Sequence, residues 1–338
     1  MKKTAKLLAV VLSVLMLVSV CSVTAFAEEA ATDYSVTGIS TLAQLEDFAA
    51  QVAGAGKYIG KPNNYEGKTV NLLADIGSVD SQGNPVKGDC LQYSIGTGIG
   101  ILQSPWKGVF DGNGHTVVVN ITALYAGLFR DNQGTIRNVA VAGKVKSLPS
   151  GVAGGICGHN QGTIQNCCNK ASVEVADISC GGGITGTNTG VVENCYSVGT
   201  FTVSETASGA GGVVGNNMLG TIINSFWDIS KFEGDGVYPT SRNPLDSKNQ
   251  VTGLTTDQCK AADGLAAFLN NYVNEKGANS GLLKWAAKGD YPVFDKTTVK
   301  NTTKKTSPKT GYNTVSVVMV VLMMVSLASV AFCAVKSR

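Results

Sequence analysis

The chain has 338 residues, of which 43% are hydrophobic and 15% charged, and 41 of them are glycine. Its formal net charge of +3 depends on the two ends: three lysines lie in the first six residues and two basic residues in the last three, with no acidic residue in 1–27 or 311–338, so residues 28–310 carry −2. Nonspecific nucleic-acid binding needs clustered positive charge, and this balance argues against a nucleic-acid partner.

Residues 1–27 have the composition of a secretory signal peptide. Lysines precede an apolar run at residues 7–20, and Ala25 and Ala27 form an Ala-x-Ala cleavage site. We predict that the chain is exported and cut after Ala27. An uncleaved membrane anchor is the alternative, and both the short apolar run and the cleavage site disfavour it.

Residues 28–60 are predicted to form an N-terminal cap with one amphipathic helix. Thr41 and Gln44 fit a capping box, and Gly54 ends the helical pattern. The apolar positions on one helical face are Leu42, Leu45, Phe48, Ala49 and Val52. Because the open end of the β-solenoid described below would expose unpaired strand edges, capping is the favoured role of this helix, and partner binding is the alternative.

Residues 61–228 are predicted to form the β-structure itself, with irregular first coils. Val70, Leu72 and Ile76 begin a strand pattern, and residues 77–100 are a polar, glycine-rich insertion. The tetrad Asp-Gly-Asn-Gly at residues 111–114 predicts a tight turn between strands.

The same region contains residue types that could build a polar site. Asp75, Asp111 and His115 are candidates for a catalytic or calcium cluster. The turn reading is favoured over a catalytic one, because the Asp-Gly-Asn-Gly-His string recurs as a turn in the family whose resemblance is described below.

One phrase occurs four times within residues 125–228. The copies read AGLFRDNQGTIRN, GGICGHNQGTIQN, GGITGTNTGVVEN and GGVVGNNMLGTIIN. Asn132, Asn160 and Asn188 are 28 residues apart, and Asn217 follows after 29. A fixed period of this size is typical of a solenoid, in which each unit buries its apolar face by stacking on its neighbours.

The segments within each copy indicate which solenoid this is. They are short, rich in Val, Ile, Thr and Cys, and separated by Gly and Asn, and no segment has ten residues with helical spacing. Helical repeats and leucine-rich repeats therefore fit poorly. Three short strands per copy predict an all-β fold, a right-handed parallel β-helix with about 28 residues per coil and coils roughly 4.8 Å apart.

Equivalent residues of stacked coils should form ladders. The predicted interior apolar ladder is Ile136, Ile164, Val192 and Ile222. Two asparagine ladders accompany it, one of Asn132, Asn160, Asn188 and Asn217 and one of Asn138, Asn166, Asn194 and Asn224. Asparagine tolerates left-handed backbone and bonds to local backbone groups, so we predict a structural role at the corners, with ligand binding as the alternative.

The repeated phrase, G-G-[IV]-x-G-x-N-x-G-x-[IV]-x-N-[CS], resembles the GLUG motif of bacterial surface proteins. The preceding YEGKTVNLLADI and PWKGVFDGNGHTVVVNIT are similar to the usual entry of that family, so the resemblance covers about residues 39–294. The first copy departs from it at Ala126 and Arg130, as expected of a terminal coil. The resemblance implies a β-helical surface protein. The family has no shared catalytic residue to transfer, and we predict no catalytic residue.

The cysteines outside residues 1–27 and 311–338 are odd in number, so they cannot all pair within one chain. They are Cys90, Cys157, Cys167, Cys168, Cys180, Cys195 and Cys259. Cys167 and Cys195 share a repeat position with Val139 and Ser225, which indicates that this position holds a small buried side chain. A Cys167–Cys195 disulfide is the alternative. With two histidines and no CxxC spacing, we predict no metal and no cofactor.

Residues 229–295 are predicted to form a C-terminal cap. Residues 230–250 read as a polar loop, 253–275 as an amphipathic helix and 282–294 as a closing strand pair. Trp285 and Tyr291 are expected to be buried cap aromatics, and the alternative is a pair of exposed rings that stack on sugars.

The remaining residues resemble a Gram-positive sortase sorting signal. A Lys- and Thr-rich linker at 296–306 precedes a motif, and an apolar segment at 315–335 follows it, long enough to span a bilayer. The motif is Ser307, Pro308, Lys309, Thr310 and Gly311. The resemblance implies cleavage after Thr310 and its attachment to peptidoglycan, with sortase as a partner. Ser307 replaces the usual Leu, which favours a sortase of different specificity.

These features predict a protein of the Gram-positive cell wall, exposed outside the cell. Before sorting, the membrane is contacted only through the C-terminal segment, and a single-pass membrane-anchored protein is the alternative. The favoured function is a non-enzymatic, adhesin-like β-helix that binds host or neighbouring-cell glycans or proteins. Two alternatives are a β-helical polysaccharide lyase or glycoside hydrolase and a passive wall spacer. The acidic residues of the repeats show no recurrent pairing, which disfavours the enzyme.

Overall fold

A computed structural model describes residues 36–97, 104–238 and 249–296. The predicted signal peptide, the sorting motif and the apolar segment at 315–335 lie outside the described residues, as does the linker beyond Lys296. Within the described ranges, no helix has the length and apolar character needed to cross a membrane.

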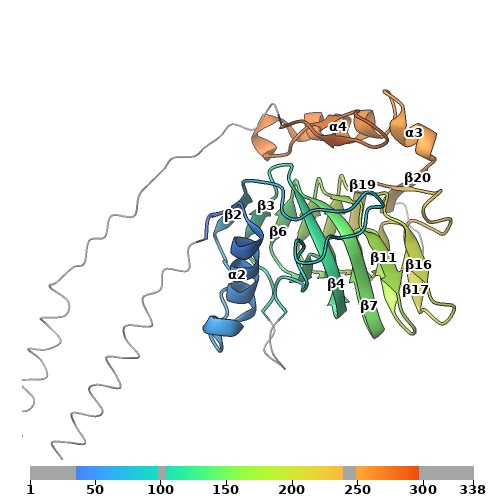
Figure 1. Cartoon of the computed structure of the whole chain (residues 1–338). Coiled ribbons are helices and arrows are strands. Elements are labelled where there is room, and N and C mark those ends of the chain that lie inside the picture. Colours follow the sequence, from blue (N-terminus) through green and yellow to red (C-terminus); the bar gives the residue numbers. More distant parts are fainter. Residues whose placement is uncertain (1–35, 98–103, 239–248, 297–338) are drawn as a thin grey trace, which may run out of the picture. The chain divides into compact units, whose positions relative to one another are not determined.

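The chain folds as a parallel β-solenoid of about five turns with about 28 residues per turn, which confirms the predicted fold class. Rungs stack in parallel register in Figure 1. The first face joins β6 (Thr135–Arg137), β9 (Thr163–Gln165), β14 (Val191–Glu193) and β19 (Thr221–Asp228). Ile136 pairs with Ile164, and Val192 with both Ile164 and Ile222. All four side chains are fully buried, so the predicted interior ladder is present.

Two further faces complete each turn. The second is a four-stranded sheet of β5 (Phe129–Asn132), β8 (Cys157–Asn160), β13 (Thr185–Asn188) and β18 (Val214–Asn217). The third contains β4 (Thr116–Ala126), β7 (Ala140–Gly154), β10 (Cys168–Asn169), β11 (Ser172–Val175), β12 (Cys180–Gly182), β15 (Tyr196–Ser197), β16 (Phe201–Val203) and β17 (Gly209–Gly211). Strand β7 pairs with β4 on one side and with β10, β11 and β12 on the other.

The two asparagine ladders have different structural roles. In the first, Asn132 donates to Asn160 at 2.7 Å, Asn160 to Asn188 at 2.8 Å and Asn188 to Asn217 at 2.9 Å, all fully or almost fully buried. In the second, Asn138, Asn166, Asn194 and Asn224 have φ of 52°, 53°, 54° and 44°. Amide-to-amide hydrogen bonds of 2.7–2.8 Å also join neighbouring side chains of the second ladder. The ladders therefore differ in backbone, because the left-handed corner expected of both belongs to the second alone.

The N-terminal segment covers the interior at the first coils. It contains β1 (Gly38–Ile39), α2 (Leu42–Ala53), η1 (Gly56–Tyr58), β2 (Thr69–Leu72) and β3 (Val109–Asp111). Phe48 of α2 packs its ring 5.5 Å from that of Trp106 and 6.0 Å from that of Phe110, a buried residue in register with Ile136. The Thr41 hydroxyl accepts from the Gln44 amide, but the Gln44 side chain bonds to Ser40 N, so the predicted capping box closes one residue earlier.

The predicted insertion at residues 77–100 is mostly part of the solenoid. Ile76 forms a bridge with Val117, Leu91 with Val119, and Ile95 with Phe129. Leu91 and Ile95 are fully buried. Within the described part of this stretch, residues 77–97, a short hairpin closed by the bridge between Val79 and Pro85 departs from the stack. The coil was not predicted from the sequence, because the apolar residues of this stretch are widely spaced among polar residues and glycines.

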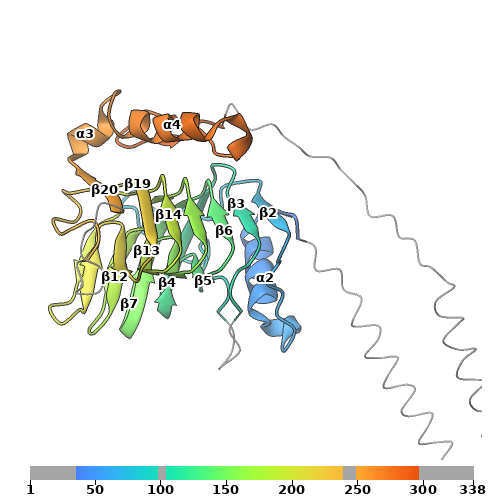
Figure 2. The same ribbon diagram turned by 180° about the vertical axis from the view of Figure 1, so that it is seen from behind.

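The C-terminal segment occupies a different place from the end cap predicted for it. It comprises β20 (Asn249–Leu254), α3 (Thr256–Lys260), α4 (Leu265–Lys276), η2 (Ala278–Ser280), β21 (Trp285–Ala286) and β22 (Val293–Phe294). Strand β20 pairs with β19, and the later elements run along the side of several coils (Figure 2). Residues 281–294, here called the strap, contact the second asparagine ladder from Asn138 to Asn166.

The strap and α4 are attached through a second hydrophobic cluster. Outward-facing Ala140, Cys168, Tyr196 and Phe226 of successive coils pack there against Leu265, Leu269, Trp285 and Phe294. Trp285 is 3% exposed, and its indole N–H donates to Asn166 Oδ1 at 2.7 Å. The ring is thus buried, as predicted, and serves to attach the strap. An exposed sugar-stacking role is wrong for this residue.

All seven cysteines of the described residues are free thiols. The Cys167 amide lies 3.4 Å from Cys195 Sγ. The disulfide considered between Cys167 and Cys195 is therefore absent, and the two residues are stacked thiols. Burial raises the pKa of the Cys157 and Cys167 thiols well above the ordinary value. Cys167 and Cys195 are buried packing residues of the interior, as their shared repeat position predicted.

Candidate functional site

Of the residues proposed for a catalytic or calcium cluster, Asp75 and His115 contact each other, whereas Asp111 bonds to other side chains. Asp111 accepts hydrogen bonds from Arg137 Nε at 2.8 Å and from Asn138 at 3.0 Å. Asp75 accepts from the Thr116 amide at 2.8 Å and lies 3.1 Å from His115 Nδ1. Among the described residues, no three His, Cys, Asp or Glu side chains gather as metal ligands. The cluster reading is therefore not supported, whereas the turn is present, with φ of 47° at Asn113.

The other histidine belongs to a surface row that the sequence reasoning missed. His159 Nδ1 lies 3.6 Å from Asp131 Oδ1, and both side chains are partly exposed on the second face. Asp131, His159 and Thr187 are register partners on β5, β8 and β13. The 28-residue period contained this signal, because it aligns Asp131 with His159. The arrangement is a contact between a carboxylate and an imidazole at the surface.

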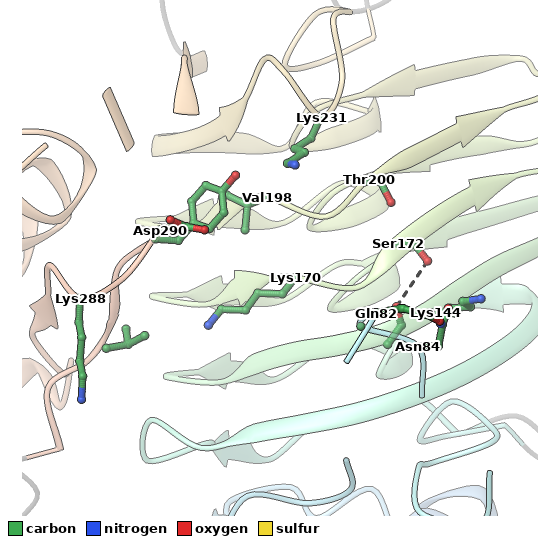
Figure 3. A pocket seen from close by; sticks show the side chains of 14 residues that line it. Gln82, Asn84, Lys144, Lys170, Ser172, Val198, Thr200, Lys231, Lys288 and Asp290 are labelled. Carbon is green, nitrogen blue, oxygen red and sulfur yellow. Dashed lines mark hydrogen bonds between the residues drawn. The ribbon is translucent and has the colours of Figure 1, made fainter. Parts of the chain in front are cut away.

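A groove on the third face is the strongest candidate site. It has a volume of about 670 Å³ and lies where three segments meet (Figure 3). Its floor comes from the solenoid, one wall from the hairpin near residue 83 and the other from the strap. The lining residues are Gln82, Gly83, Asn84, Gly143, Lys144, Lys170, Ser172, Val198, Thr200, Lys231, Lys288, Asp290, Tyr291 and Val293. We call it the lysine groove.

Four lysines and one aspartate line the lysine groove. In the described part of the chain, no carboxylate lies within ion-pair distance of Lys144, Lys170, Lys231 or Lys288. The single acid, Asp290, is paired with Lys260 at 3.1 Å, outside the lining. The groove is thus a concentration of positive charge on a region whose sequence is mildly acidic.

The floor of the groove repeats from coil to coil. Lys144 is the register partner of Ser172, whose hydroxyl is 3.4 Å from the Gly143 carbonyl. Lys170 and Thr200 flank the equivalent strands on the next two coils, and Lys231 follows β19. Parallel rungs are about 4.8 Å apart. The row of Lys144 therefore continues as the hydroxyls of Ser172 and Thr200 on the next two coils, while Lys170 lies two residues before Ser172 and Lys231 lies beyond β19.

The hairpin wall is ordered by Asp80. Its Oδ1 accepts from the Asn84 amide at 2.8 Å and the Gln82 amide at 2.9 Å. These bonds, with that from the Asn84 side chain, lower the pKa of the Asp80 carboxyl, and the nearby charge of Lys144 acts in the same direction. The carboxylate therefore fixes the turn that presents Gln82 and Asn84 to the groove.

The strap wall is held by Asp228 at the end of β19. Its carboxylate accepts from Tyr291 Oη, Ser230 Oγ and Thr256 Oγ1, each at 2.7 Å. Burial alone would raise the pKa of Asp228, but these hydrogen bonds outweigh it and hold the pKa below its ordinary value. A half-buried Tyr291 thus lines the groove with its hydroxyl already bonded.

The lowered pKa predicts acid sensitivity of the strap. A carboxylate whose folded-state pKa is depressed contributes stability above its unfolded pKa, and this contribution is lost as the pH falls through the folded value. We expect the urea midpoint to fall from pH 6 to pH 3, and the fall to be smaller in Asp228→Asn, which is destabilised already at pH 6. Asp263→Asn, at an exposed position, is the control. Equal acid loss in Asp228→Asn and the wild type would contradict this role.

None of the groove lysines was singled out in the sequence. Lys144 and Lys170 lie in neighbouring repeats, and a search for outward-facing cations on adjacent coils would have found them. Lys231 and Lys288 lie outside the periodic region, and the fold brings them to the same groove.

No family model matches the chain, and no curated protein matches it. Among solved structures, the chain is similar to the crystal structure of a protein from Bacteroides ovatus, described as a proposed immunoglobulin A1 protease. The two chains are 17% identical, the match covers 78% of this chain and 94% of that one, and the TM-score is 0.44. A likeness at this level carries no argument about the activity of this chain.

Proposed function

We propose that this protein is an exported, wall-anchored β-helix that binds an anionic ligand in the lysine groove and does not transform it. The observation that carries the proposal is the set of four lysines, contributed by solenoid, loop and strap, without an ion-pair partner among the described residues. Unpaired cations in a concave site attract anions and raise their local concentration.

The enzyme alternative has less support from the groove. Glycoside hydrolysis commonly uses two carboxyl groups across the scissile bond. The groove is lined by one, Asp290, and that one is paired with Lys260. A binding role uses the residues that are present. The passive spacer would leave the concentration of lysines without a purpose.

Charge reversal at the floor tests the proposed function. Lys170→Glu is expected to weaken binding of polygalacturonate by about tenfold or more, because it replaces an attraction with a repulsion, and a tenfold change corresponds to about 1.4 kcal/mol. Titration at low and high salt should show that the wild-type affinity falls as salt rises.

The matched control is Lys68→Glu, which makes the same charge change at an exposed lysine outside the groove lining. It should leave binding within about twofold of the wild type. Equal losses in the two variants would mean that net charge acts, not the groove. Failure of the wild type to bind any anionic ligand would contradict the proposed function and favour a passive wall spacer.

Anchoring is a separate part of the proposal and rests on the sequence features of the two ends. Replacing Thr310 with alanine is expected to shift most of the protein from the wall fraction to the membrane fraction or the medium, because the attachment residue is lost. Cell fractionation with an antibody to the β-helix measures the distribution, and Thr302→Ala in the linker is the control. Retention of the Thr310 variant in the wall would exclude sorting at this residue.

A further inference from the structure

We infer that the ligand of the lysine groove is an anionic polysaccharide that lies along the stacking direction and contacts several coils at once. This inference rests on the proposed function, and it names the class and the direction of the ligand. Its basis is the repetition of the groove floor, the chemistry of the groove lining and the pairing of the floor strands.

The floor presents a cationic or hydroxyl side chain at each successive step. Lys144, Lys170 and Thr200 come from three consecutive coils, and Lys231 follows on the next. Three steps of about 4.8 Å give a span of about 14 Å between the first coil and the last. A ligand with one small charged group would use a single step, whereas a chain with repeating anionic groups can use all of them.

The lining combines cations with neutral hydrogen-bonding groups. Ser172 and Thr200 supply hydroxyls from the floor, and Gln82 and Asn84 supply amides from the hairpin wall. Lys288 lies on the strap, on the opposite side of the groove from the hairpin wall, so cations border the groove on more than one side (Figure 3). Hydroxyl and amide groups match the hydroxyls of a sugar ring, and ammonium groups match its carboxylate, sulfate or phosphate substituents.

Nucleic acid and peptide fit the lining less well. Single-stranded nucleic acid is usually held by stacked aromatic rings, and Tyr291, the single aromatic of the lining, is half-buried and bonded to Asp228. Extended peptides commonly add to a free strand edge. Strand β11 is paired on both sides, with β7 and with β16, so its part of the floor offers no such edge.

The test is the dependence of affinity on ligand length. Purified full-length chain in mild detergent is titrated with oligogalacturonates of one to eight units, with neutral malto-oligosaccharides of equal length in parallel. We expect affinity for the acidic series to rise by more than about tenfold with length and then to reach a plateau once the groove is filled. The neutral series should bind at least about tenfold more weakly.

Two groove variants locate the direction of the ligand. Lys144→Gln and Lys231→Gln each remove a cation at one end of the groove. In each variant the affinity should stop rising at a shorter oligomer than in the wild type, while the affinity for the shortest ligands stays within about twofold. Lys68→Gln is the matched control. Thermal melting of each variant establishes that it is folded, so a lost length dependence cannot come from unfolding.

Additional ligands in the same titration distinguish which anionic group the groove prefers. Dextran sulfate and a phosphomannan carry sulfate and phosphate in place of carboxylate on a sugar chain, and preferential binding of either also supports the inference while naming the source. Tighter binding of poly-glutamate or single-stranded DNA would overturn it. An affinity that is independent of length would also overturn it, yet leave the proposed anion site intact. Binding of no anion at all would remove the proposed function itself.

Discussion

Replacing Asn160 with leucine is expected to lower the free energy of unfolding by about 2–5 kcal/mol. Asn160 is fully buried, donates to Asn188 Oδ1 at 2.8 Å and to the Val191 carbonyl at 3.1 Å, and accepts from Asn132 at 2.7 Å. Leucine has a similar shape but leaves the polar groups of both neighbours without this partner. Because the row continues to Asn217, the loss falls in the middle of a connected network.

Urea denaturation followed by tryptophan fluorescence measures this change. The control is Asn216→Leu, the same substitution at a half-buried residue beside the ladder. It should cost less than about 1 kcal/mol. Equal destabilisation by the two substitutions would show that the amide ladder adds nothing beyond local packing, contrary to the structure.

Truncation of Trp285 to alanine should have the second large effect, a loss of about 3–5 kcal/mol concentrated in the strap. The ring lies 3.9 Å from that of Phe294 and 5.3 Å from that of Tyr196, measured between ring centroids. Its N–H also donates to Asn166, which lies on a different coil from Tyr196. No other side chain of the strap joins an aromatic cluster to the asparagine ladder in this way.

Because the strap supplies Lys288 and one wall of the lysine groove, this variant should also weaken ligand binding. Hydrogen exchange is expected to rise in residues 281–294 while the solenoid strands keep their protection. Trp285→Phe is the control, since it keeps an aromatic ring in the cluster while removing the N–H and part of the indole, and it should lose less stability. A strap that stays protected in the alanine variant would show that other contacts hold it.

The solenoid could be predicted because its information is local and repeated. The 28-residue spacing places Ile136, Ile164, Val192 and Ile222 in register, and the structure pairs them so. The sequence did not distinguish the two asparagine ladders. Which asparagine takes the left-handed corner depends on where each strand ends, and the repeated letters alone do not encode that position.

The strap and the groove could not be predicted, because they depend on contacts between distant residues. Trp285 reaches Asn166, 119 residues earlier, and no period relates the two. The amphipathic pattern of α4 predicts that the helix covers an apolar surface, but it does not indicate whether that surface lies at the end or on the side of the solenoid. The lysine groove needs the hairpin, the coils and the strap in place together.

The measurement that tests the central claim most directly is a binding comparison on one array of anionic and neutral glycans. Wild-type full-length chain is compared with a variant carrying Lys144→Gln, Lys170→Gln, Lys231→Gln and Lys288→Gln, after both are shown to melt alike. The groove account predicts retention of the wild type on anionic glycans alone and loss of that retention in the variant. Equal retention of both proteins, or none of the wild type, would contradict it.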